Sequence, residues 1–282
     1  MTVLVFGRTG QVARELARAS EDVTCLGRGE ADLSVPGACA AAIERMAPRA
    51  VINAAAWTDV DGAETSEAEA TRINGDAPGE MARACAAAGI PFVHISTDYV
   101  FDGSGQTPWA PGDPTGPSGA YGRSKLAGED AVREAGGQFA ILRTSWVVSA
   151  HGRNFVTTML RLGAERDALN IVADQIGGPT PARDIAGTCL TLAGSLSAGG
   201  PSGTYHFAGA PDVSWAGFAD AIFDAAGLDC VVTPIPSSDY PTPARRPLNS
   251  RLDCASLRDD HGIDRPDWRK GLAVILSDLR RG

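Results

Sequence analysis

The sequence predicts an α/β protein with a doubly wound parallel sheet of the Rossmann type, followed by a smaller C-terminal α+β lobe. In the first half of the chain, short β-branched runs alternate with longer alanine-rich stretches, a pattern that gives right-handed crossovers and a parallel sheet. In the second half, proline- and glycine-rich connections separate short helical stretches. We therefore divide the chain into a sheet domain at 1–145 and a lobe at 146–282, some segments of which return to the sheet.

The predicted strands are apolar on both faces, as in parallel sheets that helices cover on both sides. They are Thr2–Phe6, Val23–Leu26, Ala50–Asn53, Phe92–Ser96 and Phe139–Arg143. The predicted helices between them are Gln11–Ala19, Gly37–Met46, Asp76–Ala88 and Tyr121–Glu134. In the lobe we expect helices at Phe155–Arg166, Ala182–Leu196, Trp215–Ala226 and Trp268–Leu279, and a further strand at Gly203–Phe207.

Composition excludes several classes of partner. The 282 residues are 44% hydrophobic and carry a net charge of −9 without a Lys/Arg-rich run, so we expect no nucleic-acid surface. No apolar run reaches the roughly 18–20 residues that span a bilayer, so we expect no membrane span. The N-terminus enters a strand directly, without a basic start or cleavage site, which argues against a signal peptide.

The cysteines and histidines give no sign of a disulfide or metal site. The six cysteines are scattered without a Cys-x-x-Cys pair, as expected for small buried side chains in a reducing compartment. The four histidines share no ligand spacing, so we predict no metal. These observations predict a cytoplasmic protein.

A glycine loop joins the first strand to the first helix with the spacing Gly-x-x-Gly-x-x-Ala. Gly7 permits the tight turn, Gly10 lets the backbone approach a pyrophosphate, and Ala13 lets the helix pack close to the sheet. Free N–H groups at the helix N-terminus favour anions. We interpret residues 1–145 as a dinucleotide-binding domain; the alternative is an ordinary turn between strand and helix.

The next two strand ends bear on the choice of cofactor. NAD sites place an acid after the second strand for the ribose hydroxyls, but Gly27-Arg28-Gly29 offers one guanidinium and no carboxylate. This predicts NADPH, with NADH as the alternative, although Arg28 also fits a solvated turn. Asp32 and Leu33 are expected to flank the adenine. After the third strand, the small residues Asn53–Ala56 let the backbone lie along a cofactor or simply pack at the strand end.

A Tyr-x-x-x-Lys pair is the candidate for chemistry. The spacing places Tyr121 and Lys125 one turn apart on one helix face. An ammonium close to the phenol is expected to lower its pKa from about 10 and to permit acid–base work. At the end of the fourth strand a hydroxyl, that of Thr97 or Ser96, is placed to hydrogen-bond a substrate carbonyl, or else caps the next turn. Glu129, further along the Tyr121 helix, is expected to be solvated.

These segments resemble the extended short-chain dehydrogenase/reductases, and the likeness runs nearly end to end. The strings beginning at Ser96 and Tyr240 are far more specific than the glycine loop. The matching segments are Phe6–Gln11, Asn53–Ala56, Ser96–Phe101, Tyr121–Glu129, Arg143–Trp146, Asn154–Phe155, Asp174–Gln175, Gly178–Thr180, Tyr240–Pro247 and Asn249–Asp253.

The resemblance implies roles for individual residues. Tyr121 is the implied proton donor, Lys125 its modulator and ribose ligand, and Thr97 the third catalytic residue. Thr97, Asp98 and Trp146 are expected to contact the substrate, and Asn154 and Arg245, from charge and position, its diphosphate. The complete cofactor-binding prediction is Gly7, Thr9, Gly10, Gln11, Val12, Arg28, Asp32, Leu33, Ala55, Ala56, Trp57, Thr58, Tyr121 and Lys125.

The implied activity is reduction of a nucleotide-linked keto sugar. The expected substrate is a dTDP-linked 4-keto-6-deoxy sugar, whose C4 ketone NADPH would reduce to give dTDP-L-rhamnose, in a monomer or homodimer. Two alternatives stay open: another nucleotide-sugar 4-ketoreductase of a deoxysugar pathway, or a non-catalytic NADP-binding regulatory subunit. The intact Thr97, Tyr121 and Lys125 set argues against the second.

Overall fold

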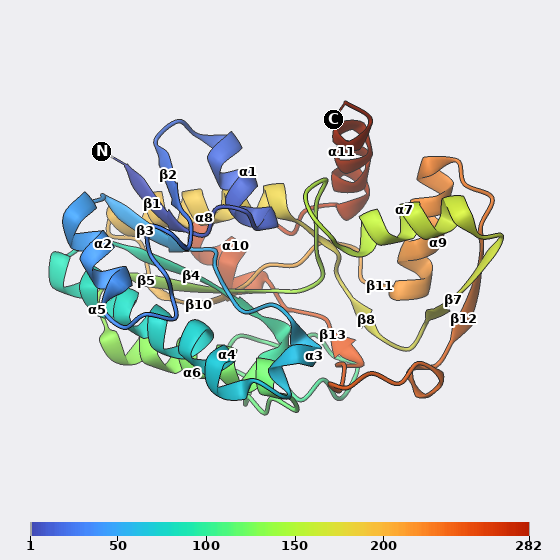
Figure 1. Cartoon of the computed structure of the whole chain (residues 1–282), viewed down its shortest axis with the longest axis horizontal. Helices are drawn as coiled ribbons and strands as arrows, with labels where there is room; N and C mark the ends of the chain where they lie inside the picture. The colour runs from blue at the N-terminus through green and yellow to red at the C-terminus, as the bar shows by residue number, and fades with distance from the viewer. Residues whose placement is uncertain (1, 282) are drawn as a thin grey trace.

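A six-stranded parallel sheet forms the centre of the molecule (Figure 1). The structure is a computed structural model, and it describes residues 2–281. The strand order is β10-β5-β4-β3-β1-β2, so the chain crosses back at β1 and proceeds outward in both directions. The strands are β1 (Val3–Phe6), β2 (Val23–Leu26), β3 (Ala50–Asn53), β4 (Phe92–Thr97), β5 (Phe139–Thr144) and β10 (Gly203–His206).

Helices cover both faces of this sheet, which confirms the doubly wound α/β class. On one face, α1, α8 and α10 bury apolar side chains against residues such as Val5 and Leu142. On the other face, α2, α5 and α6 pack against residues such as Leu4 and Ile141. The covering helices are α1 (Gln11–Ala19), α2 (Ala38–Met46), α5 (Ala77–Ala88), α6 (Ala120–Ala135), α8 (Ala182–Ser197) and α10 (Ala255–His261).

A second apolar core builds the lobe at the right of Figure 1. It gathers side chains such as Phe218, Phe223 and Trp268, which are almost fully buried. Its helices are α7 (Phe155–Glu165), α9 (Trp215–Ala226) and α11 (Trp268–Arg281), beside the parallel pair β7 (Ala168–Val172) and β12 (Val231–Ile235). Smaller ladders join β8 (Ile176–Gly177), β11 (Val213–Ser214) and β13 (Asn249–Ser250), and β6 (Val147–Val148) with β9 (Thr180–Pro181).

Segments from the second half of the sequence pack on the sheet. The strand β10 pairs with β5, and α8 packs with α1 on one face. The structure also contains short helices between β3 and α5 that the sequence did not predict, since their polar residues carry no apolar period. These are α3 (Val60–Ala63), α4 (Glu67–Thr71) and the π-helical turn Arg72–Asp76; single 3₁₀ turns lie at Asp98–Val100 and Ser237–Asp239. A domain boundary at 145/146 stays a prediction.

No helix within residues 2–281 is long and apolar enough to cross a membrane. The same residues hold no group of three or more His, Cys, Asp or Glu side chains placed to bind a metal ion.

Candidate active site

A pocket of about 480 Å³ opens at the carboxyl ends of β1, β3, β4 and β5. This is the edge where the strand order reverses, and ligands of doubly wound sheets bind there. The pocket brings together the glycine loop, the Tyr–Lys pair and Thr97. Its lining residues are Thr9–Val12, Asn53–Ala56, Thr58, Val60, Ile95–Tyr99, Tyr121, Lys125, Thr144–Val147, Gly152 and Arg153.

The glycine loop has the geometry of an anion cradle. Gly7 adopts a φ of +113°, and a Cβ there would lie 3.2 Å from the Ala54 backbone, so the turn requires glycine. A Cβ on Gly10 would meet only the Ala54 carbonyl at 4.0 Å and would project into open pocket space. Gly10 is also the N-cap of α1 and provides no side-chain cap, which leaves the first N–H groups of the helix available. These features fit the pyrophosphate of a dinucleotide.

Tyr121 projects into this pocket as a neutral phenol. Burial raises its pKa to about 12, while contact with the Thr97 hydroxyl lowers it and the Asp98 charge raises it. The pKa of Tyr121 therefore lies above its ordinary value, and Lys125 is not among the groups that shift it in this structure. Burial also raises the pKa of Asp98 to about 6. The Tyr99 ring meets Tyr121 edge-on at 5.5 Å between ring centroids and fixes its orientation.

Lys125 is 2% exposed and points to the end of β4. Its Nζ donates to the Ile95 carbonyl at 2.8 Å and lies 3.4 Å from His94 Nε2. Burial lowers the pKa of Lys125 to about 8, against the charge of Glu129, which raises it. Lys125 and Tyr121 therefore line one pocket from the same helix, although the hydrogen bonds of Lys125 go to β4.

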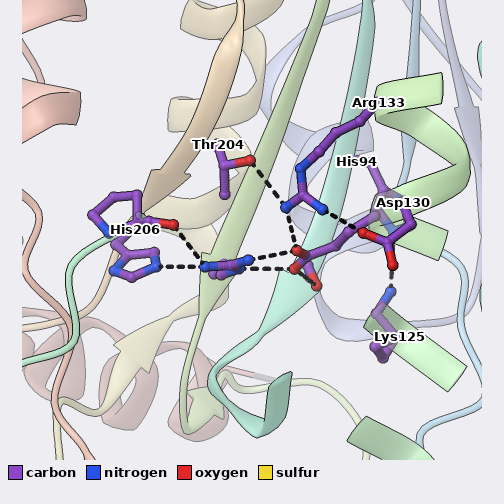
Figure 2. A network of polar contacts seen from close by, with 10 residues as sticks. His94, Lys125, Asp130, Arg133, Thr204 and His206 are labelled. Carbon is purple, nitrogen blue, oxygen red and sulfur yellow. Dashed lines mark hydrogen bonds and ion pairs between the residues drawn. The ribbon is translucent and has the colours of Figure 1, made fainter. Parts of the chain in front are cut away.

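Glu129 is fully buried, so the expectation that it is solvated is wrong. Its carboxylate accepts two hydrogen bonds from Arg143, at 2.9 and 2.6 Å, and one each from Arg133 and Ser96. Figure 2 shows the network extending to Thr204 beside Arg133 and to His206 beside Arg143. It links α6 to β4, β5 and β10, and its member Ser96 directly precedes Thr97 on β4. Glu129 closes the matching segment Tyr121–Glu129, but neither that motif nor the helical period predicted its burial or its partners.

Buried titratable groups predict lower stability in acid. Burial lowers the pKa of His94 and lowers that of His206 to about 4, whereas the unfolded chain protonates both near pH 6.5. Stability is therefore lost as the pH falls below 6.5, since the unfolded state binds more protons. Asp98 has the opposite effect on stability. Between its unfolded pKa and about pH 6, the native state binds more protons than the unfolded state, so the contribution of Asp98 to stability rises as the pH falls.

With two histidines against one aspartate, we expect a lower free energy of unfolding at pH 5 than at pH 7 in urea titrations. His206→Gln should reduce that difference, because it removes one of the two buried histidines that the unfolded chain protonates more readily than the native protein does. Stability that is equal or greater at pH 5 would contradict this prediction.

A carboxylate does stand at the end of β2, contrary to the sequence interpretation. Glu30 folds back so that its Oε2 accepts from the Gly27 N–H at 2.8 Å. Its other oxygen pairs with Arg8 of the glycine loop, and Arg8 also donates to the Cys25 carbonyl at 2.9 Å. The sequence interpretation considered only Gly27–Gly29 after the second strand, so it did not include Glu30.

Several predicted site residues lie outside the pocket lining, and their roles stay predictions. Arg28 and Arg245 are exposed, and the Asp32 carboxylate accepts from the Ser34 N–H and hydroxyl. Leu33 packs against the apolar cluster that includes Leu26 of β2. The indole N–H of Trp57 donates to the Asp59 carbonyl. Asn154 is the N-cap of α7, and its amide donates to the Ser149 carbonyl at 2.8 Å.

Trp146 forms the lobe side of the pocket in a constrained conformation. Its φ is +50°, an uncommon value for a bulky residue, and its ring stacks on Trp215 at 3.5 Å between centroids. Gly177 packs against the same indole, since a Cβ there would lie 2.9 Å from it. Backbone strain of this kind concentrates at ligand sites, where the surroundings hold the residue in place.

The whole chain matches known proteins. Residues 1–281 match the family described as RmlD substrate binding domain. The dTDP-4-dehydrorhamnose reductase of Burkholderia thailandensis is 48% identical over 99% of both chains, and that of Escherichia coli K12 is 37% identical over 99% of this chain and 98% of its own. The solved dTDP-4-dehydrorhamnose reductase of Clostridium acetobutylicum has a TM-score of 0.94 at 34% identity, covering 99% of this chain and all of its own.

A second solved relative carries a dinucleotide. The dTDP-4-dehydrorhamnose reductase of Bacillus anthracis, in complex with NADP, has a TM-score of 0.93 at 32% identity and covers 99% of this chain and all of its own. Sequence and fold both match these relatives over nearly the full length of the chain. The chain belongs to the RmlD substrate binding domain family, together with these dTDP-4-dehydrorhamnose reductases.

Proposed function

We propose that this chain uses NADPH to reduce the C4 ketone of dTDP-4-dehydro-6-deoxy-L-mannose, giving dTDP-L-rhamnose. One observation carries the proposal: the glycine loop and the Tyr121–Lys125–Thr97 set line the same pocket. The names of the relatives supply the substrate, and the relative in complex with NADP supplies the cofactor. NADH remains the alternative cofactor.

The mechanism assigns one task to each side chain. The bound nicotinamide supplies the hydride. Tyr121, a neutral phenol at physiological pH, gives its proton to the substrate oxygen as negative charge develops there. The Thr97 hydroxyl orients and polarises the carbonyl. With a dinucleotide bound, Lys125 would hold the ribose hydroxyls, and its ammonium would then stabilise the phenolate that remains on Tyr121.

The substrate occupies the side of the pocket nearest the lobe. Asp98 and Trp146 line that side, so we assign them to the sugar nucleotide. We assign the diphosphate to the segment carrying Arg245, whose neighbour Arg246 already reaches across to Asp61 on α3 at 2.8 Å. We also assign Asn154, the N-cap of α7, to the diphosphate. Because the contact between Arg246 and Asp61 joins the lobe to the sheet domain, it holds this segment beside the pocket.

The proposal is tested by the identity of the product. The chain is incubated with NADPH and dTDP-4-dehydro-6-deoxy-L-mannose, and the sugar nucleotide is analysed by NMR. We expect stoichiometric NADPH oxidation and dTDP-L-rhamnose. The C4 epimer would identify another nucleotide-sugar 4-ketoreductase, and no oxidation with any keto-sugar nucleotide would favour a regulatory, non-catalytic protein.

Glu30 gives a prediction about cofactor choice. Its carboxylate lies at the end of β2, where the adenosine ribose of a dinucleotide binds, and it pairs with Arg8. Glu30→Gln removes a negative charge from the place of the 2′-phosphate and frees Arg8 to bind it. We expect kcat/KM for NADPH relative to NADH to rise by about tenfold, equivalent to about 1.4 kcal/mol. Asp22→Asn, a change at an exposed acid before β2, is the control; an unchanged or lower ratio in Glu30→Gln would contradict the assignment.

The proposal includes a cytoplasmic setting and a monomer or homodimer. All six cysteines are free thiols, and five of them are buried. Free thiols persist in a reducing compartment, which supports the cytoplasm as the place of reaction.

A further inference from the structure

His94 lies between β3 and the Tyr–Lys helix and has no task in the mechanism above. It is 0% exposed and stands opposite Asn53 in the register of the β3–β4 ladder. Its Nδ1 is 3.1 Å from Asn53 Nδ2, and its Nε2 is 3.4 Å from Lys125 Nζ. The ring therefore connects the end of β3 to the lysine of the site.

The backbone of Ala55 fixes which way the Asn53 amide points. The Ala55 N–H donates to Asn53 Oδ1 at 3.1 Å. Because a backbone N–H can only donate, the oxygen must face Ala55, and the amide nitrogen must face His94. Asn53 therefore donates a hydrogen bond to His94 Nδ1.

That hydrogen bond determines the tautomer of His94. An imidazole nitrogen that accepts carries no proton, so the neutral ring holds its proton on Nε2. A charged imidazolium is disfavoured twice, since burial lowers the pKa of His94 well below its usual value and the charge of Lys125 lowers it further. The Nε2–H is thus directed at Lys125 Nζ.

An ammonium is a poor partner for this N–H, because it has three donors and no acceptor. An uncharged amine has a lone pair that accepts from Nε2–H while one of its own protons still goes to the Ile95 carbonyl at 2.8 Å. The surroundings of Lys125 therefore match the amine better than the ammonium. The pKa of Lys125, lowered to about 8 by burial, points the same way.

The other groups around Lys125 do not reverse this preference. Glu129, on the same helix, is the charge that raises the pKa of Lys125, but Arg143 and Arg133 already bind both of its oxygens. From β4 the neighbours are His94 and the Ile95 carbonyl, and from β3 the neutral Asn53. Tyr121, one turn earlier on α6, is an uncharged phenol.

We propose that His94 is a positioning residue that shifts Lys125 towards its uncharged amine when no dinucleotide is bound, so that binding at pH 8 is accompanied by uptake of a proton at Lys125. The inference rests on the proposed function, which places a dinucleotide in this pocket. The proton comes from solvent and converts –NH₂ to –NH₃⁺. The ribose hydroxyls then provide acceptors that His94 does not, and the anionic pyrophosphate favours the charged form.

The chain offers a direct measurement, because Lys125 and Lys270 are its only two lysines. In protein labelled with ¹³C-lysine, the two Cε signals are titrated by NMR between pH 6.5 and 11, and Lys125→Met assigns them. We expect the Lys125 signal to titrate near pH 8, with the exposed Lys270 as internal reference. Titration of Lys125 at its ordinary value of about 10.4 would overturn the inference.

Proton uptake is measured by isothermal titration of the full-length protein with NADPH at pH 8 in phosphate and in Tris. The difference in heat gives the number of protons exchanged, and the 2′-phosphate stays ionised at this pH. We expect uptake of about half a proton per site, the share of amine at a pKa of about 8. In Lys125→Met, uptake should vanish.

His94→Gln separates this role from a purely structural one. An amide oxygen at this place accepts from an ammonium, so the Lys125 titration should move up by at least one pH unit and proton uptake at pH 8 should fall below a tenth of a proton. A Lys125 titration unchanged from wild type would overturn the assignment to His94. Should the variant fail to fold, the wild-type NMR titration still decides whether the amine is favoured.

The two proposals fail in different ways. Absence of NADPH binding at any pH would remove the proposed function but leave the NMR result on Lys125 standing. NADPH binding without proton exchange, together with a Lys125 titration near 10.4, would overturn the role of His94 and leave the proposed function intact.

Discussion

Tyr121→Phe is expected to lower kcat by about 10²–10⁴-fold, the range that a positioned general acid contributes. The substitution removes one oxygen and keeps the ring that packs edge-on against Tyr99. Without that phenol, the proton for the developing alkoxide must come from water, although the carbonyl can still bind Thr97. The measurement is NADPH oxidation at saturating keto-sugar nucleotide, followed at 340 nm.

A matched control separates the loss of a proton donor from a general loss of structure. Tyr205 is also a phenol whose pKa burial raises to about 12, but its hydroxyl bonds to Asp260 and the Pro201 carbonyl, away from the pocket. Tyr205→Phe should keep turnover within about threefold of wild type, and both variants should bind NADPH as the wild type does. If Tyr121→Phe kept more than a tenth of wild-type kcat, Tyr121 would not be the proton donor.

The sheet was predictable because its signals are local. Each buried strand is a continuous apolar run, and a turn or a glycine marks its end. Strand carboxyl ends meet at one edge of a parallel sheet, so residues from separate strand ends, such as Thr9 and Thr97, were expected in one place before the fold was known. The structure brings them together in one pocket.

The buried polar groups were not predictable, because their partners are distant in sequence. Glu129 and Arg133 have the spacing of an ordinary surface pair on a helix, and only the return of β5 places Arg143 against the same carboxylate. Glu30 likewise reaches the end of β2 only because the following turn folds back to Gly27. Pattern rules describe exposure along one element, whereas these contacts depend on packing between elements.

Glu129→Gln is expected to lower the free energy of unfolding by about 3–5 kcal/mol, the effect of leaving a buried charge without its partner. Arg143 is 1% exposed, and its other contacts are all uncharged: the Pro111 carbonyl at 3.2 Å, His206 Nε2 at 3.4 Å and the Phe101 ring at 4.9 Å from its centroid. The neutral amide keeps the shape of the side chain, so lost packing contributes little. Urea denaturation at pH 7 gives the difference.

Two further variants test whether the loss of stability comes from the unpaired charge of Arg143 or from the loss of any ion pair. Glu129→Gln combined with Arg143→Met removes both charges, so it should be less destabilised than the sum of the single variants. Glu165→Gln breaks the exposed pair with Arg161, at 3.1 Å, and should cost less than about 0.5 kcal/mol. A loss below about 1 kcal/mol in Glu129→Gln would contradict this prediction, because it would mean that Arg143 does not depend on the charge of Glu129. Because Ser96 donates to Glu129 at 2.6 Å and precedes Thr97, the same substitution should also lower kcat by loosening the residue that orients the carbonyl.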